Sequence, residues 1–186
     1  MCEAIRSVWK PSPELQELME YEQARLEAYP HPLIAVQLRG GDKIAPNGNG
    51  NYGELPPGYI YDIEKGIERL NISGGTCVLM GDDSTLAERA VRALDGQCHV
   101  INRVLPHHKH DQEAFNAGTE HDRCQSTKQV LVDINIMLIA NLTIGLGVSN
   151  VIRIASLLQR CFEFREDILD WGSMNVTALS LKPQGF

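Results

Sequence analysis

The chain has 186 residues, which suits one domain with a core of its own. Its hydrophobic content of 43% and charged content of 22% are ordinary for a globular protein. A net charge of −7 argues against a general binder of nucleic acid or of acidic membrane surfaces. Any anionic ligand must therefore be bound by local positive groups.

Neither a signal peptide nor a membrane span is expected. The first 30 residues lack the apolar segment of a signal peptide, and no apolar run reaches the roughly eighteen residues of a spanning helix. The five cysteines are scattered without a Cys-x-x-Cys pair, which does not resemble a disulfide framework and favours a reducing compartment. Cys77 lies in an apolar run and is expected to be a small core residue. The chain as it stands would be cytoplasmic; as part of a longer protein it could enter the secretory pathway.

The N-terminal part, residues 1–32, is predicted to be a helical segment. Ser12 and Pro13 are typical helix-start residues, and apolar residues recur at helical spacing over 14–29. Prolines at 30 and 32 end the pattern. The residues expected on the apolar side are Leu15, Leu18, Met19 and Leu26.

From residue 33 onward, short apolar runs alternate with segments of helical spacing. Strands are predicted at 33–38, 76–80, 99–104 and 142–146, and helices at 59–70, 85–94, 127–140 and 151–160. A polar, Gly- and Asn-rich loop covers about 40–57, and the tail after 162 is not assigned. This alternation predicts an α/β fold: a Rossmann-like open parallel sheet with helices on both faces, formed by residues 33–186.

Three polar turns follow predicted strands, at residues 39–43, 81–84 and 145–150. Ligands of open α/β sheets bind at the carboxyl ends of the strands, so these turns are candidates for one site. In the last turn, glycines and a helix N-terminus could bind a phosphate, although Ser149 could equally just cap the helix. Arg39 offers a planar fork for phosphate oxygens, or else a local ion pair in a surface turn.

The roles of the carboxylates allow more than one interpretation. Asp82 and Asp83 could bind a metal or sugar hydroxyls, while Asp83 alone could cap the next helix. Asp133 stands in an apolar segment, where burial without a partner is costly. It is expected to accept hydrogen bonds from buried backbone or from a base edge such as the N1–H and N2–H₂ of guanine.

A histidine-rich stretch raises the question of a metal site. His107, His108 and His110, with His121 and Cys124 farther along, lack any standard zinc spacing. A solvated loop is the better interpretation, and no metal site is expected there.

Three segments together resemble one family of enzymes. IAVQLRGGDK (34–43), VLMGDDSTLAERA (78–90) and KQVLVDINIMLIANLTIGLGVSNVIRIASLL (128–158) are similar, in order and spacing, to motifs of the α1,6-fucosyltransferases and the related bacterial chitooligosaccharide fucosyltransferases. The resemblance implies the donor-binding half of a GT-B glycosyltransferase. It also implies transfer of fucose from GDP-fucose, or of a related GDP-sugar, with inversion to a glycan or protein acceptor, without a metal or cofactor.

The resemblance also implies roles for individual residues. Arg39 would hold the β-phosphate and stabilise the leaving diphosphate, Asp133 would read guanine, and Ser149 and Asn150 would contact the diphosphate. Gln37 stands where relatives carry a histidine that touches the base, and Gly40 where the α1,6 enzymes carry a second arginine. The full set of substrate-binding candidates is Gln37, Arg39, Asp42, Lys43, Asp82, Asp83, Val130, Asp133, Ser149 and Asn150.

The catalytic base departs from the family's pattern. The family's glutamate falls near Asn47 here, so Glu54 is the candidate base in that loop, beside Arg39 as the other catalytic residue. The chain has room for one Rossmann-like half, so a partner domain or a second copy of the chain could complete it. Two alternatives stay open: a non-catalytic nucleotide-sugar-binding module, and a vestigial domain that serves as a structural or interaction protein.

Overall fold

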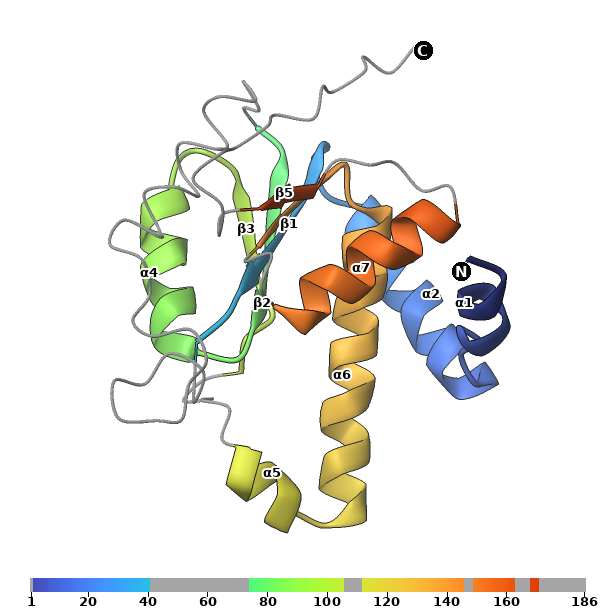
Figure 1. Cartoon of the computed structure of the whole chain (residues 1–186). Coiled ribbons are helices and arrows are strands. Elements are labelled where there is room, and N and C mark those ends of the chain that lie inside the picture. Colours follow the sequence, from blue (N-terminus) through green and yellow to red (C-terminus); the bar gives the residue numbers. More distant parts are fainter. Residues whose placement is uncertain (1, 41–73, 106–111, 146–148, 163–167, 171–186) are drawn as a thin grey trace.

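The computed structural model describes residues 2–40, 74–105, 112–145, 149–162 and 168–170. Helices and strands alternate along most of this part of the chain (Figure 1). Their bounds are α1 (Cys2–Val8), α2 (Pro13–Glu27), β1 (Leu33–Leu38), β2 (Thr76–Gly81), α4 (Ser84–Leu94), β3 (His99–Asn102), α5 (Gln112–Ala117), α6 (Glu120–Ile139), β4 (Leu142–Gly145), α7 (Asn150–Cys161) and β5 (Ile168–Asp170).

The strands form one parallel sheet in the order β3-β2-β1-β4-β5. β1 lies at its centre, where Ile34 pairs with Cys77 of β2 on one side and with Leu142 of β4 on the other. The Rossmann-like open parallel sheet predicted from the sequence is confirmed. Strand β5 comes from the tail that the sequence pattern left unassigned.

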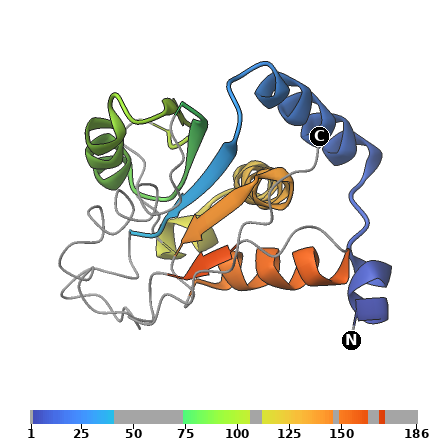
Figure 2. The ribbon, with the colours of Figure 1, turned by 90° about the horizontal axis from the view of Figure 1, so that it is seen from above.

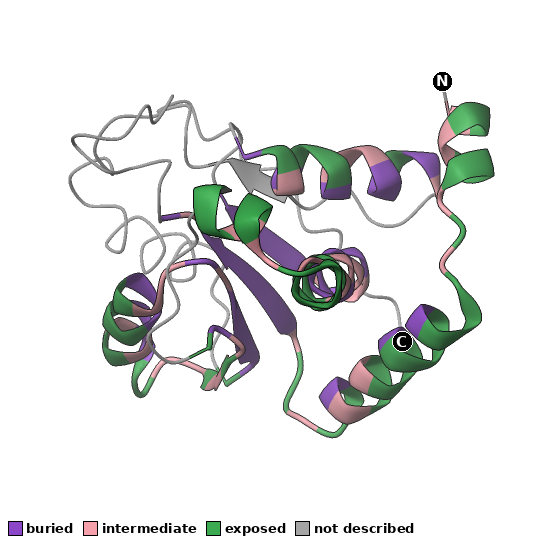
Figure 3. Cartoon of the chain, turned by 90° about the horizontal axis from the view of Figure 1, so that it is seen from below, coloured by how far each residue is buried: buried purple, intermediate pink, exposed green. Residues whose placement is uncertain are grey.

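The sheet is covered on both faces, which explains why its strands are apolar runs rather than alternating patterns. Ile34, Val36 and Leu38 of β1 pack in a core with α4, whereas Leu33 and Ala35 pack in a second core with α2, α6 and α7. Figure 2 shows α4 on one side of the sheet and the other three helices on the opposite side. All six residues of β1 and all four of β4 are buried, and Figure 3 shows buried strands, in purple, between the helices.

Helix α1 lies within the predicted N-terminal helical segment, before the helix start expected at Ser12, and it is attached to the second layer. Ile5 and Trp9 pack against a small cluster of α6 and α7 residues, and Arg6 donates from Nε to the Cys161 carbonyl at 2.6 Å. Of the helices in the described part of the chain, none combines the length and apolarity needed to cross a bilayer.

Several element bounds differ from those predicted. Helix α6 begins at Glu120 rather than near 127, because Thr119 and Asp122 form a capping box that starts the helix earlier. Strand β3 ends at Asn102, whose side chain accepts from the Val104 N–H and turns the chain out of the sheet. Leu18 of α2 was expected to face the core but is 39% exposed. The predicted loop at 40–57, apart from Gly40, and the helix at 59–70 lie outside the described residues.

The expectation of unpaired cysteines is wrong. Cys2 is bonded to Cys161, and Cys77 is bonded to Cys98, while Cys124 is free and exposed. Cys77 is fully buried as predicted, but as half of a bridge that links β2 to the start of β3. Sequence spacing could not show these pairs, because each depends on elements that meet in the fold. The cysteine pattern therefore no longer supports a reducing compartment.

This connectivity predicts one reactive thiol per chain in oxidised protein, at Cys124. Thiol titration of denatured, unreduced protein should detect one group, and peptide mapping should recover the Cys2–Cys161 and Cys77–Cys98 bridges. Breaking the second bridge with Cys77→Ala and Cys98→Ala should lower the free energy of unfolding by about 3 kcal/mol, because the open loop gains entropy when unfolded. Cys124→Ala is the matched control. Five reactive thiols in unreduced protein would contradict the assignment.

Candidate functional site

A pocket of about 570 Å³ opens at the carboxyl edge of the sheet. The ends of β1, β2 and β3 form its floor, and α5 with the stretch of α6 from Gln125 to Met137 forms one wall. The N-terminal half of α6 extends past this edge in Figure 1. Its volume is in the range of small-molecule and cofactor sites. Its charged and amide side chains include Gln37, Arg39, Asp82, Arg103, Gln125, Gln129 and Asp133.

The rest of the wall is mainly apolar. Leu105 and Val130, which are 64% and 43% exposed, border the pocket together with Phe115. Exposed side chains of this kind offer a flat surface to a planar ligand such as a base. Val130, one of the predicted substrate-binding residues, therefore lies in the pocket wall.

Arg39 and Asp82 meet at the floor of the pocket. Arg39 follows β1 and Asp82 follows the neighbouring β2, so the parallel register brings the two side chains together as an ion pair between Nη1 and Oδ2. The other oxygen, Oδ1, accepts the Gly40 backbone N–H at 2.7 Å. This pair joins the ends of two strands and so differs from the local ion pair within the turn that the sequence left open.

Gly40 lies close to the side chain of Asp83, at the start of α4. A Cβ at this position would lie 2.6 Å from Oδ2 of Asp83. The second arginine that the resembling family carries at this point has no room here.

Asp83 caps the helix that follows it. Its side chain accepts from the backbone N–H groups of Thr85 and Leu86 at 3.0 and 3.1 Å, so it is the N-cap of α4. The capping role that the sequence left open is therefore confirmed. Asp83 does not belong to the pocket lining within the described residues.

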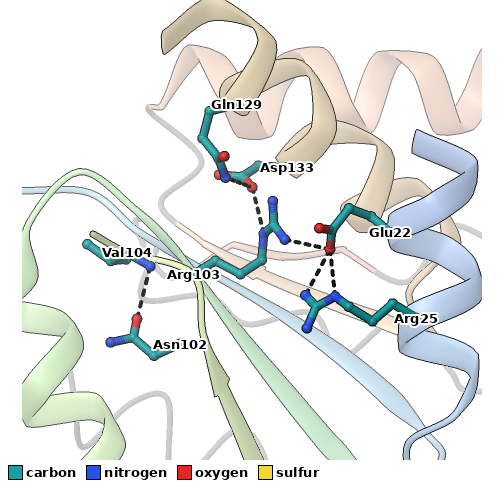
Figure 4. A network of polar contacts seen from close by, with 7 residues as sticks. All are labelled: Glu22, Arg25, Asn102, Arg103, Val104, Gln129 and Asp133. Carbon is teal, nitrogen blue, oxygen red and sulfur yellow. Dashed lines mark hydrogen bonds and ion pairs between the residues drawn. The ribbon is translucent and has the colours of Figure 1, made fainter. Parts of the chain in front are cut away.

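Asp133 lies in a polar network between three elements (Figure 4). Its Oδ1 accepts from Arg103 Nε at 3.0 Å and from Gln129 Nε2 at 2.9 Å. Arg103 also donates from Nη1 to Glu22 of α2 at 2.7 Å, and Glu22 in turn accepts from Arg25. The expected partners of Asp133, backbone or a base, are thus replaced in this structure by a buried guanidinium and an amide.

Burial raises the pKa of the Asp133 carboxyl from 3.8 to about 6. The positive charge and hydrogen bond of Arg103, and the hydrogen bond of Gln129, oppose this rise in pKa, while the charge of Glu22 adds to it. A buried carboxyl with a strongly raised pKa in a pocket is a frequent feature of functional sites.

Arg103 and Glu22 were not found from the sequence. Arg103 follows β3 directly, and it is the same carboxyl-edge position that singled out Arg39 and Asp82 on the neighbouring strands. The predicted strand over 99–104 placed Arg103 inside the strand, whereas β3 ends one residue before it. Glu22 gave no signal, because a glutamate on an exposed helix pattern is usually solvated.

The remaining predicted site residues either are absent from the described pocket lining or lie outside the described residues. Ser149 occupies the N-cap position of α7 without a side-chain cap hydrogen bond, and the described lining includes Val151 but neither Ser149 nor Asn150. Gly145 lets α7 approach β4, since a Cβ there would lie 2.6 Å from Cγ1 of Ile152. Asp42, Lys43 and Glu54 lie outside the described residues.

Metal-binding groups do not gather in the described part of the chain. Within it, no three His, Cys, Asp or Glu side chains come close enough to hold an ion. His121 and Cys124 lie on exposed positions of α6. His107, His108 and His110 lie outside the described residues.

The raised pKa of Asp133 predicts a titration midpoint near pH 6 for its carboxyl carbon in ¹³C NMR. Because the folded-state pKa is above 3.8, stability from the protonated group is complete below about pH 4 and is lost as the pH rises through about 6. Relative to Asp133→Asn, the wild-type free energy of unfolding should therefore fall by roughly 3 kcal/mol between pH 4 and pH 7. A midpoint at or below pH 4 would contradict this picture of the site.

The fold matches solved structures, although neither a protein-family model nor the sequence of a curated protein matches this chain. NodZ alpha-1,6-fucosyltransferase, soaked with GDP-fucose, aligns with a TM-score of 0.59 and 15% identity over 97% of this chain and 52% of its own. POFUT1 in complex with GDP-fucose aligns with a TM-score of 0.52 and 13% identity over 84% of this chain and 45% of its own. POFUT1 in complex with GDP gives a TM-score of 0.51 at the same identity.

The chain thus spans about half the length of the structures that it matches. At this level of identity the likeness concerns the fold. One of these structures is an alpha-1,6-fucosyltransferase, and the three sequence segments resemble a family of that kind. The chain has a fucosyltransferase-like, Rossmann-type α/β fold.

Proposed function

We propose that the pocket at the carboxyl edge binds GDP-fucose or a related GDP-sugar, and that the chain is the donor-binding part of a fucosyltransferase-like glycosyltransferase. The observation that carries this proposal is one pocket lined by both Arg39 and Asp133, at the edge where ligands of open α/β sheets bind. Its fold partners have been solved with GDP and GDP-fucose, which supports the choice of nucleotide.

The two ends of the pocket offer different chemistry. Asp133, between apolar side chains, is suited to a base edge with two donors, as guanine presents. Arg39 is suited to the diphosphate, because a guanidinium binds phosphate oxygens through two parallel hydrogen bonds. In this proposal a phosphate oxygen takes the place of Asp82 beside Arg39, exchanging one anionic partner for another.

Transfer would follow from the same contacts. As the glycosidic bond to the diphosphate breaks, negative charge grows on the β-phosphate, and a prepositioned Arg39 stabilises that charge more than the ground state. Glu54 is proposed as the base that takes the proton of the acceptor hydroxyl. Metal ions are not part of this proposal, since Arg39 supplies the positive charge at the phosphate.

The acceptor is proposed to be a glycan or a protein, held with the help of a partner domain or a second copy of the chain. The length of the matching structures motivates this, because each is about twice as long as the aligned part of this chain.

A second candidate is a non-catalytic module that binds the nucleotide sugar. One observation favours it: both carboxylates in the described lining, Asp82 and Asp133, are ion-paired with arginines and are poorly placed to accept a proton from an acceptor. Nucleotide binding without turnover would support the module.

Isothermal titration calorimetry tests the donor site. Wild type should bind GDP and GDP-fucose, and Arg39→Ala should weaken GDP binding by at least roughly tenfold, since a hydrogen bond to a charged group contributes about 1.5–3 kcal/mol. Arg92→Ala, which removes an exposed arginine from α4, is the matched control and should bind as wild type does. EDTA should not change the affinity.

No GDP binding below millimolar concentration would refute the donor site. So would binding that Arg39→Ala leaves unchanged, because the nucleotide would then lie elsewhere.

A transfer assay distinguishes the enzyme from the module. Release of GDP from GDP-fucose, followed with glycan and peptide acceptors present, should occur with wild type and fall by about a hundredfold or more in Glu54→Gln, as expected when a general base is lost. GDP binding by that variant should stay unchanged. Turnover that Glu54→Gln does not slow would remove Glu54 from the mechanism, and binding with no turnover would favour the module.

A further inference from the structure

We propose that Arg103 is a positioning residue of the nucleotide pocket, which holds the Asp133 carboxylate by one oxygen so that the other is presented to the base. This inference rests on the proposed function, because it concerns how the same pocket would select guanine. It adds a residue that neither the sequence motifs nor the comparisons identify.

The hydrogen bonds of Asp133 are one-sided. Arg103 Nε and Gln129 Nε2 both donate to Oδ1, at 3.0 and 2.9 Å. Within the described residues, nothing donates to Oδ2. Asp133 and Arg103 both line the pocket, so the second oxygen is available to a ligand there.

Arg103 is itself held from two directions. Its backbone N–H donates to the Leu79 carbonyl at 2.9 Å, which continues the register of β2 and β3. Its Nη1 donates to Glu22 of α2 at 2.7 Å, and its side chain is 9% exposed. Glu22 is fixed by Arg25, whose Nε and Nη2 donate to the same oxygen at 3.1 and 2.8 Å (Figure 4). The guanidinium therefore has little freedom to turn away from Asp133.

Among the charged groups that the structure describes around Asp133, Arg103 is the one that favours the ionised carboxylate. Glu22 adds a negative charge from α2, and Gln129 of α6 is neutral. Arg39 and Asp82 pair with each other at the ends of β1 and β2. In the described part of the chain, Arg103 is the one cation bonded to Asp133. Without it, burial and Glu22 would both favour the protonated carboxyl.

An ionised carboxylate is what guanine requires at this position. The N1–H and N2–H₂ of guanine are two donors side by side, and a carboxylate is an acceptor without a proton of its own. Adenine presents an acceptor at N1, which an ionised Asp133 would repel. By fixing both the charge and the direction of Asp133, Arg103 would thus determine the preference for guanine.

The test is GDP binding as a function of pH, between pH 5 and 8.5, in wild type and Arg103→Met. Wild-type affinity should decline below about pH 6, where Asp133 becomes protonated. Removing an adjacent opposite charge raises a carboxyl pKa by about 1–3 units, so the decline in Arg103→Met should begin that much higher. At pH 7 its affinity should be roughly tenfold weaker and should recover as the pH is raised. Its preference for GDP over ADP should shrink in parallel.

Two further variants separate positioning from packing. Arg103→Lys keeps the positive charge and should restore most of the wild-type pH profile. Arg92→Met removes an exposed arginine of α4, outside this network, and it should leave the profile in place. If Arg103→Met does not fold, Arg103→Gln takes its place, because it removes the charge but keeps a polar side chain, and ¹³C NMR of Asp133 in this variant should show a pKa above that of wild type.

The outcomes are distinct. Suppose that wild type binds GDP and that Arg103→Met lowers the GDP affinity equally at every pH. This result would overturn the positioning role and leave the proposed function standing. A wild type that binds no GDP at any pH would overturn the proposed function itself.

Discussion

The burial of β1 on both faces is the constraint on which the site depends. A strand of six buried residues must have a hydrogen-bonded neighbour on each side and helices above and below, since unpaired backbone groups in the interior are costly. β2 occupies one side and β4 the other, although they are distant in sequence. The strand order therefore changes direction at β1, and in open α/β sheets a crevice forms at such a point.

Each side chain of the pocket follows from that arrangement. Residues that directly follow neighbouring parallel strands share one edge, which brings Arg39, Asp82 and Arg103 together without any special local sequence. Helix α6, begun early by its capping box, then carries Gln129 and Asp133 over the same edge. The polar groups are held by each other, as Figure 4 shows for Arg103 between Glu22 and Asp133.

The polar network around Asp133 has a cost in stability. Burying Asp133 is unfavourable enough to raise its pKa to about 6 in spite of Arg103 and Gln129. A carboxyl kept in such a place lowers stability at neutral pH, and proteins commonly retain that kind of group where a ligand needs it. The same logic applies to Arg39, whose pairing with Asp82 gives it an anionic partner before a phosphate arrives.

The sequence predicted the sheet well because short apolar runs such as 33–38 and 76–80 are typical of parallel strands that are buried on both faces. It also predicted the edge at which polar residues gather, and Val130 and Asp133, which the family resemblance singled out, line the pocket there. It missed Arg103, because the predicted strand ran to residue 104 and so placed this arginine inside the strand, and because its partner Glu22 lies 81 residues away. The two disulfides and β5 were missed for the same reason, because they are set by which elements meet in space.

The most direct test of the central claim is a crystal structure of the chain with GDP. We expect the guanine edge to lie within hydrogen-bond distance of Asp133 Oδ2 and a phosphate to lie beside Arg39 in place of Asp82. Arg103 should still be bonded to Asp133 Oδ1. GDP bound at another surface, or a pocket that stays empty at saturating GDP, would contradict it.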